Sequence, residues 1–346
     1  MKPAVYGVPF AELKAFCAEQ GQPAFRAKQV FDWLYKQHVS SFDEMKNLPA
    51  AFRNQLEKSF SICPAMLIEI TGTAGQTQKL LFKLTDNELI ETVIIPAPRT
   101  GRNTVCVSSQ VGCAFRCAFC ASGQKGIIRN LTAGEIIGQV TVIAGMLGKR
   151  PDNIVFMGIG EPFDNYDEVL CAIRILNSAE GFEIGARRIT ISTCGLIPGI
   201  RRLGEEGLQV ELSVSLHAPD NELRSQLMPV NKRWPFAELL AACEEYTAKT
   251  KRIITFEYTL INHVNDSPAQ AHQLAQRLKT FPCRVNLIPL SPVAEFSGER
   301  SDPETMQEFC RCLKKSGINT TLRDSKGVSL KAACGQLRSQ KTADGL

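Results

Sequence analysis

The sequence lacks an apolar run long enough to span a bilayer. The longest, residues 136–147, is interrupted by Gly and Gln, whereas a membrane-spanning helix needs about 20 predominantly apolar residues. The first residues, Met1 to Tyr6, also lack the apolar core of a signal peptide. We therefore expect a cytoplasmic protein without a membrane partner.

Acidic residues are missing from one stretch of an otherwise ordinary composition. The 346 residues are 44% apolar and carry a formal net charge of +5, which is usual for a globular protein. Residues 101–129 contain no Asp or Glu, and residues 311–341 contain eight Lys or Arg against the single Asp324. Such basic segments indicate either a polyanionic partner or a solvated surface, and the composition leaves both open.

The thirteen cysteines show no pattern of a small disulfide-bonded domain, and a chain of this length does not need disulfides to fold. Eight are scattered and are expected to be small buried apolar residues: Cys17, Cys63, Cys171, Cys194, Cys243, Cys283, Cys310 and Cys312. Three others, Cys113, Cys117 and Cys120, form a Cys-x3-Cys-x2-Cys loop, which can present three thiolates to one metal centre.

Three thiolates on one loop suit an iron–sulfur cluster that keeps one iron open for a small chelating ligand. The alternative is a closed structural zinc site, to which Cys106 would add a fourth thiolate. Zinc ligands more often come as two closely spaced pairs, and no second pair lies nearby. The spacing, together with Phe119 before the third cysteine, favours the cluster.

This loop resembles the cluster signature of the radical S-adenosylmethionine (SAM) superfamily. The resemblance implies that the open iron binds the amino and carboxylate groups of SAM. It also implies that one electron from the cluster cleaves SAM to a 5′-deoxyadenosyl radical.

Hydrophobic periodicity divides the chain into four parts. Helical spacing from Phe10 to Phe60 predicts a small N-terminal helical domain over residues 1–65, an accessory domain for RNA if the basic side chains contact phosphates. Period-two strands predict a short antiparallel β extension over residues 66–100. From residue 103 short strands alternate with amphipathic helices, so we predict an α/β fold, a radical SAM partial (βα)6 barrel over residues 101–338, and then a tail at residues 339–346.

In such barrels the chemistry lies at the carboxyl ends of the strands. The turn at Gly158, Gly160 and Glu161 can bring bare backbone to a ligand and offer a carboxylate to an ammonium group, although tight packing alone would also explain the glycines. The other strand ends carry short groups that suit a zwitterion and a ribose, each of them individually common as a strand-end cap: Ser192, Ser215, Leu216, His217 and Asn286.

Two further residues stand out for opposite reasons. Cys334 follows the last predicted strand, near Lys331 and other basic residues, which could lower the pKa of its thiol and make it a nucleophile. A buried structural cysteine is the alternative, and it is the one that the residue type alone favours. Glu91 lies in a predicted strand, where an isolated glutamate is expected to face solvent.

Taken together, the motifs resemble those of the radical SAM RNA adenine-C2 methyltransferases. The resemblance extends from about residue 6 to residue 338 and rests on these segments: residues 106–120, 129–132, 158–162, 215–218, 286–289 and 332–337. It implies methylation of carbon 2 of an adenosine in 23S rRNA and of the adenosine 3′ of the anticodon in tRNA, with two SAM molecules used for each methyl group.

The resemblance also implies residue roles. Cys113, Cys117 and Cys120 would hold one [4Fe-4S] cluster, while SAM would be bound by Gly160, Glu161, Ser192, Ser215, Leu216, His217 and Asn286. Cys334 would carry the methyl group as S-methylcysteine, Cys106 would form a disulfide with it, and Glu91 matches a family glutamate assigned as proton acceptor. We expect a monomer that receives electrons from a one-electron reductant such as flavodoxin.

Three alternatives remain open from the sequence. A sister group methylates carbon 8 of the same ribosomal adenosine with the same cysteines. A zinc-stabilised RNA-binding protein without catalysis would use Cys106, Cys113, Cys117 and Cys120 as ligands and would leave Cys334 dispensable. A radical SAM activase of a partner protein would share the loop but have no use for the pair Cys106 and Cys334.

Overall fold

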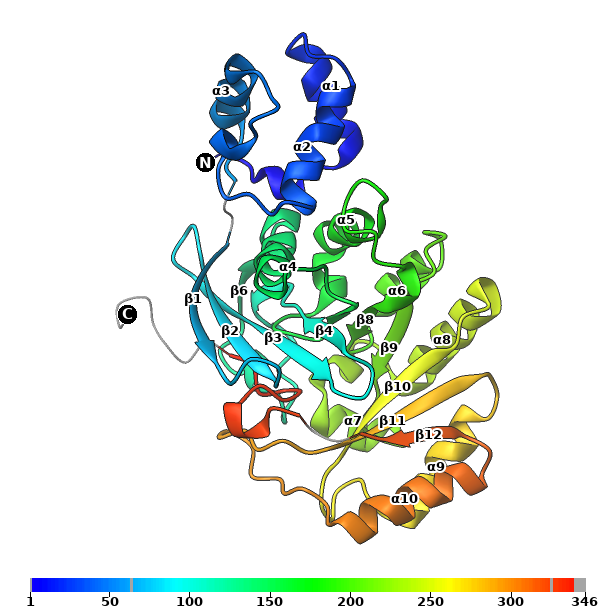
Figure 1. Cartoon of the computed structure of the whole chain (residues 1–346). Coiled ribbons are helices and arrows are strands. Elements are labelled where there is room, and N and C mark those ends of the chain that lie inside the picture. The colour runs from blue at the N-terminus through cyan, green and yellow to red at the C-terminus, as the bar shows by residue number, and fades with distance from the viewer. Residues whose placement is uncertain (1, 63–64, 324–325, 339–346) are drawn as a thin grey trace.

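A ten-stranded sheet runs through the molecule in the order β1-β2-β3-β4-β7-β8-β9-β10-β11-β12 (Figure 1). The computed structural model describes residues 2–62, 65–323 and 326–338. Neighbouring strands are antiparallel from β1 to β4 and parallel from β4 to β12. The strands are β1 (Ala65–Thr71), β2 (Gln78–Leu84), β3 (Leu89–Ala97), β4 (Arg102–Cys106), β7 (Asn153–Phe156), β8 (Ile189–Thr193), β9 (Glu211–Ser215), β10 (Ile254–Leu260), β11 (Cys283–Pro289) and β12 (Asn319–Leu322).

Helices connect the parallel strands, and most of them lie along the outer side of the curved sheet (Figure 1). They are α4 (Ala133–Leu147), α5 (Tyr166–Asn177), α6 (Ile197–Leu203), α7 (Asn221–Leu227), α8 (Phe236–Thr250), α9 (Pro268–Leu278) and α10 (Pro303–Lys315). Six βα units followed by β12 confirm the predicted α/β fold. Within the described residues β1 and β12 do not pair, so the sheet remains open.

Local sequence explains where α4 begins and ends. The Thr132 side chain accepts a hydrogen bond from the Glu135 backbone, and the Glu135 carboxylate accepts one from the Thr132 backbone, which forms a capping box. The helix ends at Gly148, whose φ of 62° is the left-handed conformation that glycine adopts readily. Arg129 joins Glu135 to Asp86, and so ties this helix start to the β extension.

The N-terminal region contains α1 (Phe10–Glu19), α2 (Phe25–Tyr35) and α3 (Ala50–Ser59). Aromatic edge-to-face contacts hold these helices together, with ring centroids 5.0 Å apart for Phe10–Phe31 and for Phe16–Phe60. The unit packs directly on α4, because a Cβ at Gly7 would lie only 2.4 Å from the Gly134 nitrogen. A side chain at Gly7 would therefore separate the two parts.

Sequence periodicity did not reveal the shortest elements. Strands β5 (Gln110–Gly112) and β6 (Ile127–Asn130) form a separate hairpin, and α6 and α7 have seven residues each. Segments of this length give too few repeats for a period to be recognised. Cys63, Asp324 and the tail at residues 339–346 lie outside the described residues.

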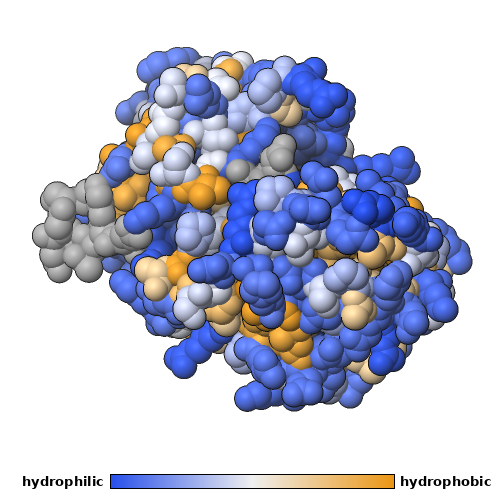
Figure 2. Space-filling model, turned by 90° about the horizontal axis from the view of Figure 1, so that it is seen from below, coloured by the Kyte–Doolittle hydropathy of each residue, from blue (hydrophilic) through white to orange (hydrophobic). Residues whose placement is uncertain are grey.

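Polar side chains dominate the face of the molecule in Figure 2, with smaller apolar patches between them. Among the described helices, none combines the length and the apolar character that a bilayer crossing requires.

Candidate active site

The cysteine loop is enclosed by the β5–β6 hairpin. The Cys113 backbone donates to the Gly126 carbonyl at 3.0 Å, which closes the loop at its base. The Ala118 backbone donates to the Leu227 carbonyl at 2.9 Å, which joins the loop to the end of α7. The loop is therefore held at both its base and its tip.

The three thiols of this loop lie close enough to affect one another. The pKa of Cys117 is raised above its ordinary value, mainly by burial and then by Cys120 and Cys113. Burial raises the pKa of Cys113 to about 12, with smaller effects of Glu161 and Cys120. Uncompensated thiolates would be costly here, so the site suits a bound cationic centre that removes the protons.

The zinc alternative finds no support in the placement of these residues. Cys106, its fourth ligand, is buried at the end of β4 and packs against Val93, Ile159, Ala332 and Leu337. Within the described residues, no three His, Cys, Asp or Glu side chains converge on a single ion. Three thiols on one loop without a fourth fit an iron–sulfur cluster that keeps one iron open better than a closed zinc site.

The glycines after β7 are explained by packing against the protein. A Cβ at Gly160, where φ is 109°, would lie 2.6 Å from the Gln110 Cβ, and one at Gly158 would lie 2.6 Å from the Val107 carbonyl oxygen. The tight turn positions Glu161, which is only 3% exposed. Its carboxylate accepts hydrogen bonds from the Cys194 backbone at 2.7 Å and the Phe163 backbone at 3.1 Å.

Glu161 lies close enough to the cysteine loop for its charge to raise the pKa of both Cys113 and Cys117. Burial raises the pKa of the Glu161 carboxyl, and the hydrogen bonds from Cys194 and Phe163 oppose that shift. A buried carboxylate next to the cluster loop suits an ammonium group, as predicted for SAM.

The predicted strand-end residues line neighbouring parallel strands. Ser192 pairs in register with Ser213, and Glu257 pairs with both Ser215 and Asn286. Because paired residues in a sheet share one face, these polar groups form one wall. Ser192, Ser215 and Asn286 are half-buried and so remain partly accessible.

Leu216 and His217 contribute differently. Leu216 is fully buried, and its backbone donates to the Glu257 carbonyl at 3.0 Å. The His217 ring packs edge-on against Phe119 with centroids 4.7 Å apart, and its Nδ1 accepts a hydrogen bond from the Thr259 backbone. Burial and then Arg224 lower the pKa of His217 to about 3, so the imidazole is neutral.

The segment that carries Cys334 lies against both the cluster loop and Cys106. The Gly335 carbonyl accepts a hydrogen bond from the Ala121 backbone at 2.7 Å, and the Leu337 carbonyl accepts one from the Ser122 hydroxyl at 2.6 Å. These bonds fasten the Cys334 segment to the loop. Cys106 packs against the same segment, and burial and then a Cys334 thiolate raise the pKa of Cys106. Both thiols are free.

The predicted lowering of the Cys334 pKa is wrong. Cys334 is reached by solvent, yet the surrounding protein desolvates its thiol and raises its pKa to about 12. Glu257 and Cys120 add to this rise, and only Arg323 and a backbone hydrogen bond oppose it. The neighbours in space are acidic groups and thiols, whereas the basic residues are neighbours in sequence.

The predicted solvent exposure of Glu91 is also wrong. The side chain is 4% exposed, forms an ion pair with Lys79 at 2.8 Å, and accepts a hydrogen bond from the Arg338 backbone at 2.9 Å. Strand β3 is covered by α4 on one side, where Thr92 donates to Gln139 at 2.7 Å. The C-terminal segment covers the Glu91 side, a contact 247 residues away in sequence.

Sequence reasoning missed Glu257, which lies in the middle of the polar wall. It is 5% exposed; its Oε1 accepts from Ser213 at 3.2 Å and Asn286 at 3.1 Å, while Oε2 is buried without a partner. Arg323 approaches to 3.9 Å. In the sequence Glu257 alternates with Thr255 and Thr259 on an otherwise apolar strand, and this pattern was the signal that could have identified it.

Glu257→Gln is expected to stabilise the cluster-free protein at neutral pH by about 1 kcal/mol, because an ionised buried oxygen without a partner is costly. Burial raises the Glu257 pKa, so the cost is present above the folded-state pKa and disappears as the pH falls through it. Urea unfolding at about pH 5 and about pH 8 measures this difference. The exposed Glu244→Gln is the control, and an equal gain at both pH values would contradict the explanation.

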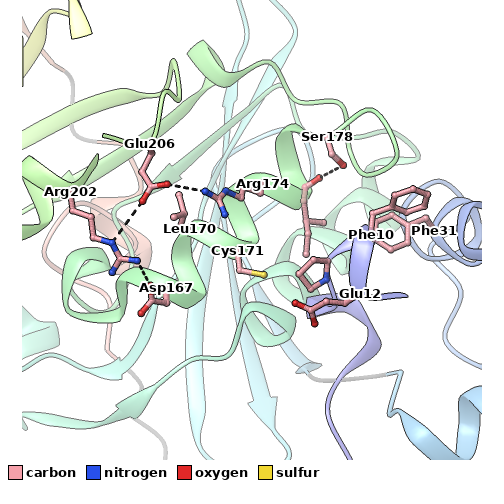
Figure 3. A pocket seen from close by; sticks show the side chains of 12 residues that line it. Phe10, Glu12, Phe31, Asp167, Leu170, Cys171, Arg174, Ser178, Arg202 and Glu206 are labelled. Atoms are coloured by element: carbon pink, nitrogen blue, oxygen red, sulfur yellow. Dashed lines mark hydrogen bonds and ion pairs between the residues drawn. The ribbon is translucent and has the colours of Figure 1, made fainter. Parts of the chain in front are cut away.

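A separate cavity of about 610 Å³ lies between the N-terminal helices and α5 (Figure 3). Phe10 and Phe31 line one end. At the other end Arg174 pairs with Glu206, and Arg202 contacts Asp167. None of the predicted site residues lines this cavity, so it is separate from the candidate active site.

Comparisons with known proteins agree with this geometry. Residues 107–275 match the family model of the radical SAM superfamily, and residues 5–62 match that of the ribosomal RNA large subunit methyltransferase N-terminal domain. The structure of a radical SAM methyltransferase from Sphaerobacter thermophilus is similar over 97% of this chain and 99% of that one, with a TM-score of 0.93 and 47% identity.

Two curated relatives are similar over nearly the whole chain. Each is described as a probable dual-specificity RNA methyltransferase RlmN. The one from Akkermansia muciniphila is 46% identical over 95% of this chain and 94% of its own length. The one from Symbiobacterium thermophilum is 47% identical over 96% of this chain and 91% of its own length.

The fold and the three-cysteine loop thus define a radical SAM enzyme, for which a [4Fe-4S] cluster and SAM are the implied cofactors. Within that class, the chain belongs to the RlmN family of RNA methyltransferases.

Proposed function

We propose that this enzyme methylates carbon 2 of adenosine in 23S rRNA and in tRNA, at the position 3′ of the anticodon, through an S-methylcysteine at Cys334. The placement of the Cys334 segment against both Cys106 and the cluster loop is the observation that supports this proposal most. A methyltransferase that moved the methyl group directly from SAM would have no use for two such thiols.

Carbon 2 lies between two ring nitrogens and is electron-poor, so it does not attack the electrophilic methyl group of SAM. When bound, the cluster supplies the electron that makes SAM a source of a hydrogen-abstracting radical. Cys113, Cys117 and Cys120 would hold the cluster, and Glu161 would hold the ammonium group of SAM. Ser192, Ser215, His217 and Asn286, with the backbone at Gly160 and Leu216, would complete the cradle.

The remaining chemistry belongs to the protein's own groups. Cys334 would lose its proton and accept a methyl group from one SAM, forming an S–CH3 bond as the SAM sulfonium releases it. After a hydrogen atom is removed from that group, its carbon would bond to carbon 2 of the adenine. Cys106 would then attack the Cys334 sulfur, forming a disulfide and breaking the bond between sulfur and the new methyl carbon. That carbon would take up a proton to become the methyl group, and the one electron left over from the radical addition would be returned to the cluster.

Carbon 2 must also lose its proton to a base before release. Glu91 is buried and its pKa is raised by that burial, which favours proton uptake by the carboxylate. Its hydrogen bond to the Arg338 backbone brings it next to the segment that carries Cys334. Glu91 and Cys106 are the two candidate bases.

RNA would contact the exposed basic side chains around the loop. Arg116 and Lys125 are exposed, whereas Arg129 is occupied by Asp86 and Glu135. The target adenine must leave its stack, at a cost of a few kcal/mol unless the RNA already presents it unpaired. These substrates would place the enzyme in the cytoplasm, with a one-electron reductant such as flavodoxin as its partner.

Mass spectrometry of rRNA and tRNA from cells with and without the gene tests the proposal. We expect C2-methyladenosine to disappear from both RNAs in the deletion strain. The same analysis separates the C8 alternative, because the two methyladenosines are distinguishable. Loss of C8-methyladenosine alone would contradict the proposal.

A further inference from the structure

Arg224, on α7, is a positively charged side chain that is fully buried inside the protein. It has no solvent exposure and is the largest of the fully buried side chains among the described residues. A guanidinium stays protonated in proteins, so burial does not make it neutral. Removing such a charge from water is costly unless an anion compensates it.

No carboxylate provides that compensation. The Arg224 guanidinium donates to the Asn231 side chain at 2.8 Å and to the backbone carbonyls of Cys194 at 2.7 Å and Ser215 at 3.1 Å. All three acceptors are uncharged, and the Nε atom is buried without a partner. Across residues 2–62, 65–323 and 326–338, Arg224 belongs to none of the ion pairs found within 4.0 Å.

The charge faces the cluster loop. Arg224 lies near enough to Cys117 and Cys194 to interact electrostatically with both side chains. The hydrogen bond from Ala118 to Leu227 holds the loop against the end of the same helix. A Cβ at Gly195 would lie 2.9 Å from the guanidinium, so only glycine allows this close approach.

The cluster would supply the missing anion. An iron–sulfur cluster held by three thiolates carries a net negative charge, which increases when the cluster is reduced. A fixed cation beside it favours the reduced form, because net charge and burial set the reduction potential of such clusters. The hydrogen bonds from Arg224 to these carbonyls also fix the chain at the carboxyl ends of β8 and β9, next to the predicted SAM-binding residues Ser192 and Ser215.

We propose that Arg224 is the built-in counter-cation of the iron–sulfur cluster, which raises its reduction potential and positions the two strand ends that face it. This inference rests on the proposed function only in requiring the cluster. Arg224 acts through the cluster and the backbone, so it is a positioning residue.

An EPR-monitored redox titration of the anaerobic holoenzyme, without RNA, tests this role. Arg224→Met removes the charge, and we expect the reduction equilibrium to become at least tenfold less favourable, which is 59 mV for a one-electron couple. Arg224→Lys keeps the charge and is expected to remain within threefold of the wild type. Arg201→Met, which removes an exposed arginine paired with Glu245, is the control for net charge.

A second variant avoids deleting the buried side chain. Asn231→Asp places a carboxylate against the guanidinium and neutralises it, so the potential should fall as in Arg224→Met. Unchanged potentials in Asn231→Asp and Arg224→Met would overturn the proposal. If Arg224→Met loses the cluster while Arg224→Lys retains it, the charge is needed; equal loss in both variants would overturn the role of charge. If the variants show the expected reduction potentials but the wild-type enzyme produces no methylated adenine, only the proposed function is disproved.

Discussion

Cys334→Ala is expected to lower the rate of RNA methylation by at least about a thousandfold, because it removes the atom that would carry the methyl group. Reductive cleavage of SAM should continue, since the cluster loop and Glu161 are untouched. The fold should persist, because Cys334 is an exposed residue and its segment is held by the backbone bonds of Gly335 and Leu337.

Three measurements on one preparation separate these effects. Intact-protein mass spectrometry after incubation with SAM should show one added methyl group on the wild type and none on Cys334→Ala. Release of 5′-deoxyadenosine reports SAM cleavage, and methylated adenine in a synthetic RNA reports the complete reaction. Cys283→Ala, which removes a half-buried thiol at the start of β11, is the matched control. RNA methylation that survived in Cys334→Ala would overturn the assignment.

The sequence predicted the fold well because its main elements are long enough to repeat. The alternation of strands and helices from residue 103 was visible because the apolar positions of each element recur along the chain. The cysteine loop was equally visible, because its three thiols are close in sequence. Both features depend only on residues that are close in sequence, so they can be recognised without a structure.

The errors in the site all concern contacts between distant segments. Glu91 was expected in solvent because nothing nearby in sequence covers it, whereas the Arg338 backbone does so from 247 residues away. The Cys334 pKa was judged from basic residues beside it in the chain, whereas Glu257 and Cys120 are its neighbours in space. Electrostatics depends on distance in space, so sequence proximity was misleading.

Arg224 illustrates what no pattern could supply. An arginine on a short helix is ordinarily a surface residue, and only the coordinates reveal that it is fully buried without a carboxylate. The same holds for Glu257, whose significance depends on an oxygen that lacks a partner. Buried charges of this kind are recognised by what surrounds them.

Cys106→Ala is expected to stop the reaction after the new carbon–carbon bond has formed. Without the second thiol, nothing breaks the bond between the Cys334 sulfur and the transferred carbon, so the RNA should remain covalently attached to the protein. Alanine removes little volume from the apolar cluster around Cys106, and the fold should tolerate it.

Denaturing gel electrophoresis of Cys106→Ala incubated with SAM, reductant and labelled RNA should show a stable protein–RNA band. Tryptic mass spectrometry should locate the attachment at Cys334. The double variant Cys106→Ala with Cys334→Ala should form no adduct, which controls for non-specific crosslinking. Free methylated RNA at the wild-type rate from Cys106→Ala would show that the paired sulfurs do not act in sequence, because release would then need no second thiol.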